Sequence, residues 1–111
     1  MTNMDLMKLK QVSQGLLDRW SNERILLSCE IVSGHIRMEL YQCSAERDGA
    51  ELILSGNDVE ISISLLGCGY ALLPHASWSE DSKIKFLENY RSGIQIWTDA
   101  NASCTLIEHK A

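Results

Sequence analysis

Apolar and polar residues alternate through most of the stretch between positions 24 and 66. The apolar positions of this alternation are Ile25, Leu27, Cys29, Ile31, Ile36, Met38, Leu40, Val59, Ile61, Ile63 and Leu65. A period of two residues is typical of β-strands that bury one face and expose the other. The stretch therefore predicts four antiparallel strands that share one apolar face.

The first turn of this meander is predicted at positions 33–34, because a two-residue loop containing glycine is a common hairpin connection. This loop places Ile31 opposite Ile36, which keeps two apolar residues together. It also places Glu30 opposite Arg37, an opposite-charge pair on the other face. A slip of one residue would send every apolar side chain to the wrong face, so both pairs support this register.

The next two turns are also predicted at glycines. A three-residue loop at 47–49, with Gly49 in the left-handed conformation, keeps the leucines that follow it on the apolar side. A two-residue loop at 56–57 then pairs Leu54 with Val59 on the same face. The three turns and the shared apolar face are mutually consistent, as a sequence that specifies one fold requires.

Residues 4–22 are predicted to form an amphipathic helix. Its apolar stripe consists of Leu6, Leu9, Val12, Leu16, Leu17 and Trp20, with Ser13 among them. A stripe of this width suits a helix that covers one face of a sheet. The alternative is a helix that binds a partner or a second copy of the chain, because Met4 and Met7 lie off the stripe.

Positions 67–78 interrupt the alternation with glycines, a proline and several large apolar residues. The glycines predict a bend or bulge at the end of the fourth strand. The large apolar residues are Tyr70, Leu72, Leu73 and Trp78. We expect this connection to fold back on the core; the alternative is that it forms part of a binding patch, where aromatic residues are common.

A second, shorter helix is predicted over residues 79–91. Ser77 with Glu80 fits a capping box, and Ser79 is the alternative cap for a slightly later start. Gly93 is placed to follow the C-terminal cap. The narrow apolar face of this helix consists of Ile84, Leu87 and Tyr90.

The last part of the chain is predicted to form a hairpin around a four-residue turn at 99–102. Two short runs of strand-forming residues flank this turn. The loop length sets Ile94 opposite Ile107 and Trp97 opposite Cys104.

The chain has 111 residues and a formal net charge of −5, which predicts a single acidic domain over residues 1–111. An acidic surface disfavours nucleic acid, whose binding proteins neutralise phosphates, and it suits solubility or a basic protein partner. No apolar run approaches the roughly 20 residues of a membrane helix, and no secretory signal opens the chain. We therefore expect a cytoplasmic protein that does not bind membranes.

The four cysteines form no Cys-x-x-Cys pair, so their spacing carries no zinc or redox signature. Cys29 falls on the apolar face, where cysteine behaves as a small hydrophobic residue. We expect reduced thiols, with no metal and no cofactor. A disulfide that involves Cys43 is the alternative.

Recognisable catalytic motifs are absent, including the nucleophile elbow and the glycine-rich phosphate loops. The constellation closest to a reactive site is Cys68 with His75, a pair that could act as a nucleophile and its base or as metal ligands. Tyr70 and Trp78 are close to this pair in sequence. The alternative function is therefore a small-molecule-binding module or minor enzyme whose pocket contains Cys68, Tyr70, His75 and Trp78.

Together these elements predict an α+β domain built on an antiparallel meander of about six strands. The N-terminal helix packs on one face of the sheet, and the second helix precedes the C-terminal hairpin. The bends at Gly49, Gly56 and Gly67 favour a sheet that curls toward a small barrel.

The expected function is a non-catalytic protein–protein interaction domain, such as an adaptor, a chaperone-like or an immunity-like protein. We expect it to act as a homodimer or with a partner chain, because the outward face of the sheet also carries apolar residues. These outward residues are Leu26, Val32, Tyr41, Ile53 and Leu66. The predicted partner-binding residues are Tyr41, Ile53, Leu66, Tyr70, Leu72, Leu73 and Trp78.

Overall fold

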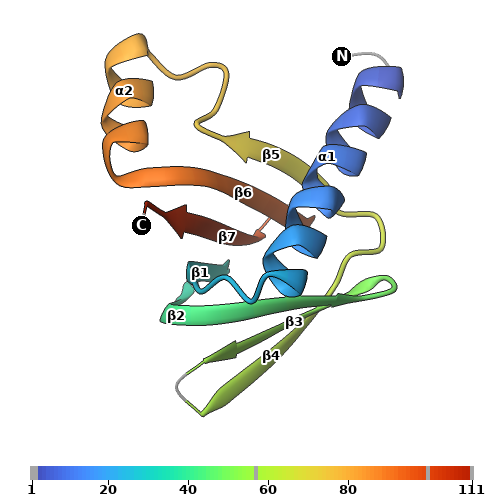
Figure 1. Cartoon of the computed structure of the whole chain (residues 1–111). Helices are drawn as coiled ribbons and strands as arrows, with labels where there is room; N and C mark the ends of the chain where they lie inside the picture. The colour runs from blue at the N-terminus through green and yellow to red at the C-terminus, as the bar shows by residue number, and fades with distance from the viewer. Residues whose placement is uncertain (1–2, 57, 100, 111) are drawn as a thin grey trace.

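The computed structural model describes residues 3–56, 58–99 and 101–110 (Figure 1). Within these residues the chain forms two helices and seven antiparallel strands, which confirms the predicted α+β class. The elements in chain order are α1 (Asn3–Asn22), β1 (Leu27–Ser33), β2 (Ile36–Asp48), β3 (Glu51–Gly56), β4 (Val59–Ser64), β5 (Gly69–Leu73), α2 (Glu80–Asn89), β6 (Tyr90–Asp99) and β7 (Ala102–His109).

The sheet is strongly curled and remains open. Its strand order is β4-β3-β2-β1-β7-β6-β5, so β4 and β5 are the two edges. Six spacings of a flat sheet would separate these edges by about 29 Å. The connection at 65–68 that joins them can span only about 18 Å. The two edges therefore approach each other at this end, but the described strands do not close a barrel.

The strand β5 lies in the segment predicted to be an irregular connection. It is short and has no polar–apolar alternation, so sequence periodicity gives no sign of it. Its main chain pairs with β6, while Tyr70 and Leu72 pack against the core. The expected return of this segment to the core is correct, and the expected absence of a strand is wrong.

The first hairpin turns one position later than predicted. Ser33 pairs with Ile36, and the first residue of the two-residue loop is Gly34, with a φ of 60°. Positive φ at this position is the geometry of the type II′ hairpin turn. The predicted pairing of Glu30 with Arg37 is wrong as a register, yet the guanidinium still reaches the Glu30 carboxylate diagonally at 2.7 Å. Because the register differs by two residues, Ile36 and Met38 still point to the predicted face, but their expected burial is wrong, since both are exposed.

A β-bulge in β2 reverses which residues of that strand face the core. Cys29 pairs with Leu40, but Leu27 pairs with Cys43, so β2 holds one extra residue. Gln42 lies at this bulge with a φ of 58°, the left-handed region that few non-glycine residues adopt. Before the bulge Leu40 is buried, and after it Cys43 is buried.

This bulge explains why the predicted three-residue turn at 47–49 is wrong. Asp48 pairs with Glu51, so the loop holds two residues, and Leu54 lies opposite the buried Ala45. The predicted left-handed Gly49 is confirmed by its φ of 62°.

The other two hairpins also differ from the predicted registers. Gly56 pairs with Val59, so the β3–β4 register differs from the prediction by two residues. Asn57 of the predicted loop lies outside the described residues. In the C-terminal hairpin Ile94 pairs with Leu106, one residue from the prediction. Trp97 pairs with Ser103 rather than Cys104 and is exposed, because it alternates with the buried Ile96 along β6.

Helix α1 covers the concave face of the sheet between β2 and β5, as Figure 1 shows. Leu17 and Trp20 are fully buried there, together with Ser13. The predicted stripe is wrong in its N-terminal half, where Leu6 and Val12 are exposed. The reason is that the N-terminal end of the helix extends beyond the sheet. Met7 is exposed as well, and the side chain of Met4 lies outside the described part of the chain.

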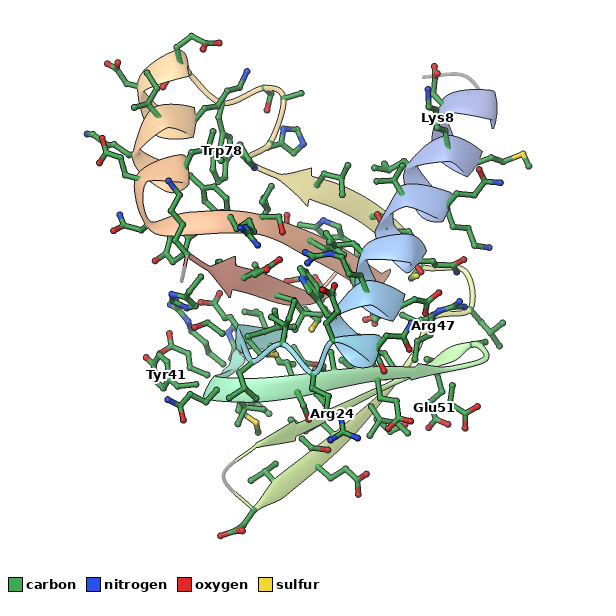
Figure 2. All side chains as sticks on the ribbon, viewed as in Figure 1. Lys8, Arg24, Tyr41, Arg47, Glu51 and Trp78 are labelled. Atoms are coloured by element: carbon green, nitrogen blue, oxygen red, sulfur yellow. The ribbon has the colours of Figure 1, made fainter. Side chains whose placement is uncertain are left out.

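A charged pair fixes α1 to the long strand β2. Arg47 Nε donates to Asp18 Oδ1 and its second nitrogen donates to Oδ2, both at 2.8 Å. Figure 2 shows Arg47 reaching from β2 toward the helix. This bidentate pair sets the position of the helix along β2.

Helix α2 buries a different residue from those predicted. Ser79 caps it by accepting a hydrogen bond from the Ser82 N–H, so the alternative cap is correct. Phe86 is buried, whereas Ile84 and Leu87 of the predicted apolar face are exposed. The Phe86 ring packs between Trp78, which precedes the helix, and Tyr90, which follows it. These two contacts fix the rotation of the helix.

Gly93 does not follow the helix cap but lies inside β6. Tyr90 is the C-terminal cap and β6 begins at the same residue, so the predicted glycine cap is wrong. A Cβ atom at position 93 would lie 3.0 Å from the Leu106 carbonyl oxygen and 3.1 Å from the Leu73 side chain. The glycine therefore permits close packing within the sheet.

Candidate functional site

A shallow groove crosses the convex face of the sheet over β2, β1 and β7. We call it the outer groove; its volume is about 270 Å³. A second hollow of about 370 Å³ shares Ser28, Tyr41 and His109 with it and continues toward Leu26 and Gln42. The outer groove is lined by Ser28, Cys29, Glu30, Glu39, Tyr41, Tyr90, Thr105, Ile107 and His109.

Strand alternation places these side chains on one face. Ser28 and Glu30 alternate with the buried Leu27 and Cys29 along β1. Tyr41 follows the buried Leu40 on β2 and points to solvent, as Figure 2 shows.

Two hydrogen-bonded groups occupy the outer groove at its β7 end. Ser28 Oγ and His109 Nε2 are 2.5 Å apart. The Tyr90 ring meets the His109 ring edge-on, with centroids 5.1 Å apart. His109 is thereby held between β1 and the start of β6.

A charged cluster occupies the other side of the outer groove. Arg37 donates to Glu30 at 2.7 Å and lies 3.3 Å from Glu39, which in turn accepts from the Tyr41 hydroxyl at 2.8 Å. The hydrogen bond to Glu30 raises the pKa of Arg37. The hydrogen bond to Glu39 raises the pKa of Tyr41, so the phenol stays protonated.

The Ser28–His109 pair does not have the organisation of an activated nucleophile. In a catalytic arrangement a third group orients the base, and donors await the developing oxyanion. Among the described residues no carboxylate is hydrogen-bonded to His109, and the imidazole is exposed. Sequence reasoning missed this pair because its members are 81 positions apart and meet only through the pairing of β1 with β7.

The residues predicted to bind a partner do not form one patch. Tyr41 lies in the outer groove and Leu66 follows β4, both exposed, while Trp78 is partly exposed before α2. The remaining four are half-buried: Ile53, Tyr70, Leu72 and Leu73. Their roles in binding stay predictions.

The four residues predicted for the alternative ligand site do not come together in one pocket either. Burial and the neighbouring Cys68 thiol raise the pKa of Tyr70 to about 12. His75 accepts hydrogen bonds at Nδ1 from the Ser77 main chain and hydroxyl, at 3.1 and 2.6 Å. Trp78 packs against Phe86 with ring centroids 5.8 Å apart. Cys68 and Tyr70 are thus brought together, while His75 and Trp78 make local contacts of their own.

Three of the cysteines meet in the core. Cys29 and Cys104 have their sulfur atoms 3.9 Å apart, and Cys43 neighbours Cys29. The hydrogen bond with Cys104 and burial raise the pKa of Cys29, and the hydrogen bond with Cys29 and burial raise the pKa of Cys43. All four cysteines are free, and no group of three or more potential ligands in the described residues could hold a metal ion. These thiols act as core residues.

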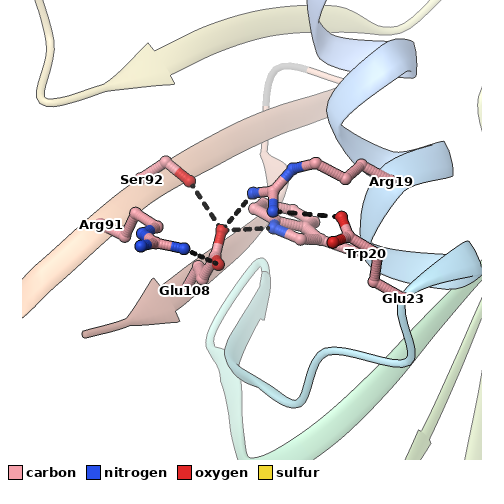
Figure 3. A network of polar contacts seen from close by, with 6 residues as sticks. All are labelled: Arg19, Trp20, Glu23, Arg91, Ser92 and Glu108. Atoms are coloured by element: carbon pink, nitrogen blue, oxygen red, sulfur yellow. Dashed lines mark hydrogen bonds and ion pairs between the residues drawn. The ribbon is translucent and has the colours of Figure 1, made fainter. Parts of the chain in front are cut away.

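The buried carboxylate of Glu108 joins α1 to the last two strands (Figure 3). Although only 4% exposed, it accepts hydrogen bonds from Arg19 at 2.5 Å, from Trp20 Nε1 at 2.8 Å and from Ser92 at 3.2 Å. Burial by itself would raise the pKa of Glu108, but the hydrogen bonds from Trp20 and Arg19 outweigh it and hold the pKa below its ordinary value.

This lowered pKa makes the stability of the protein depend on pH. The folded state binds a proton at Glu108 less readily than the unfolded state, so the contribution is present above the unfolded pKa and is lost as pH falls through the folded one. We expect the free energy of unfolding to fall between about pH 5 and pH 3. Urea denaturation at several pH values checks this, and Glu108→Gln should show a shallower slope than the parent chain. Equal slopes would contradict the assignment.

Comparison with known protein families, with characterised proteins and with solved structures finds no match for this chain. The fold and the site are therefore described by their own geometry, as a mixed α+β domain with an open, curled antiparallel sheet. None of the helices in the described part of the chain is long and apolar enough to cross a membrane.

Proposed function

We propose that this chain is a small acidic, non-catalytic protein-binding domain of the cytoplasm that acts with a partner chain or as a homodimer. The exposed apolar side chains on its surface support the proposal. Leu26 is 54% exposed, Tyr41 62% and Leu66 77%, and neither helix nor the C-terminal hairpin covers them. Large exposed apolar side chains near a groove are typical of interaction surfaces.

The chemistry of the outer groove agrees with binding rather than catalysis. Its carboxylates are already engaged by Arg37 and by the Tyr41 hydroxyl. Carboxylates that are already paired in this way are not set up as a general acid and a general base. The net charge of −5 favours a partner with a basic surface.

Native mass spectrometry of the untagged protein, isolated from its own cells, tests this proposal. We expect a mass above the 12.5 kDa of one chain, resolved as a dimer or a complex with another protein. A lone chain that carries a small extra mass would instead support the small-molecule alternative and contradict the proposal.

A matched pair of variants distinguishes binding at a specific surface from nonspecific association through exposed apolar residues. The double variant Leu26→Ser, Tyr41→Ser, at two exposed residues that line the same hollow, should lose the additional chain. Ile84→Ser on α2, where the isoleucine is 55% exposed, should retain it. Retention of the additional chain by the double variant would remove these two residues from the interface.

A further inference from the structure

The edge strand β4 has unpaired main-chain groups. The Leu65 N–H donates to the Ala50 carbonyl at 2.7 Å, which marks this pair as hydrogen-bonded. Hydrogen-bonded pairs recur at every second residue of an antiparallel ladder, so Ile63 and Ile61 also bond inward to β3. The N–H and C=O groups of the residues between them therefore point away from the sheet. These residues are Glu60, Ser62 and Ser64.

A cavity of about 330 Å³ lies against this edge, and we call it the seam cavity. Ser62, Ile63 and Ser64 line it from β4, and because these residues belong to both faces of the strand, the cavity extends around the free edge. Ile31 of β1 and Cys104 of β7 line it from the opposite side. The seam cavity therefore lies between the free edge of β4 and the strands β1, β6 and β7.

The seam cavity is uncharged. Its remaining lining residues are Val32, Ser33, Leu66, Thr98, Ala102 and Ser103, so none of its walls carries an ionisable carboxylate or a basic group. Natural edge strands are usually protected by lysine, proline or a covering element. In β4 only Glu60 is charged, and Figure 1 shows no described element beyond the strand.

We infer that the free edge of β4 binds an extended, uncharged segment of a partner protein, with one of its apolar side chains in the seam cavity. Main-chain hydrogen bonds to Ser62 and Ser64 supply affinity, and the cavity between Ile63 and Ile31 selects the side chain, as in other strand-addition complexes. An extended peptide is the favoured occupant because its amides repeat at the two-residue spacing of the unpaired groups. This inference rests on the proposed function and names the chemistry of its partner.

The experiment uses the full chain and an array of acetylated, amidated hexapeptides in which threonine alternates with each apolar residue in turn. We expect a subset to bind in fluorescence anisotropy. Methylation of the peptide amides on the strand-facing side should weaken binding by about tenfold or more, since it removes main-chain donors without changing side chains. Equal binding of the methylated peptide would overturn the inference.

Hydrogen exchange locates the binding. The bound peptide should slow exchange of the Glu60, Ser62 and Ser64 amides, whereas the Ile61 and Ile63 amides are already protected by β3. Protection at the outer groove instead, or protection of these amides only by self-association of the chain without peptide, would overturn the strand-addition site.

Matched charge variants test the cavity. Leu66→Lys introduces a charge at its wall and should weaken the best peptide about tenfold. Met7→Lys, at an α1 position that is 62% exposed, should leave binding unchanged. If no peptide of the array binds while native mass spectrometry still shows a complex, the strand-addition site is wrong and the proposed function stands.

Discussion

Replacing Glu108 by alanine should lower the free energy of unfolding by about 3 kcal/mol. The carboxylate accepts hydrogen bonds from Arg19, from the fully buried Trp20 and from Ser92. Its removal takes away the hydrogen-bond acceptor of the buried Trp20 N–H, and a buried donor without its acceptor is costly. Urea denaturation at pH 7 measures the loss.

Two further variants separate the charge of Glu108 from its role as an acceptor. Glu108→Gln keeps an oxygen near Trp20 and should cost about half as much as alanine. Glu46→Ala removes an exposed carboxylate from β2 and should change the free energy of unfolding by less than about 0.5 kcal/mol. If Glu108→Ala were as mild as Glu46→Ala, the network of Figure 3 would not hold α1 to the sheet.

Gly93→Ala should destabilise the protein by about 2 kcal/mol through overpacking. The added Cβ would lie 3.0 Å from the Leu106 carbonyl oxygen, which is part of the β6–β7 ladder and cannot move away without breaking it. The Leu73 side chain, at 3.1 Å, closes the other side. Thermal and urea denaturation measure the effect.

The matched control for this glycine is Gly69→Ala in the neighbouring strand β5. Its Cβ would meet only the Trp97 Cβ at 3.9 Å, an ordinary van der Waals distance. We expect this variant to be as stable as the parent chain, or slightly more stable because alanine restricts the unfolded state. Equal losses at both positions would indicate a general intolerance of the strands rather than a close contact at Gly93.

The candidate sites lie where distant segments meet, and this limited their prediction. Glu108 looks like an ordinary solvent-facing carboxylate in the sequence, yet the structure buries it against a helix 88 positions earlier. Ser28 and His109 are neighbours only because β7 pairs with β1. The seam cavity forms where β4 approaches β1, β6 and β7 across the curl of the sheet. Tyr41 and Leu66 were predicted as exposed apolar residues because each departs from its local pattern, and both are exposed.

Local periodicity by itself determined the class of the fold, the extent of α1 and the four strands of the meander, because the two-residue and 3.6-residue periods act within single elements. Only the tertiary structure decided the registers. Gln42 at the bulge changes which face of β2 is buried, and shifts of one or two residues elsewhere are chosen by contacts between strands. Tertiary packing likewise decided that Leu17 is buried and Leu6 is not, because only the C-terminal half of α1 has the sheet beneath it.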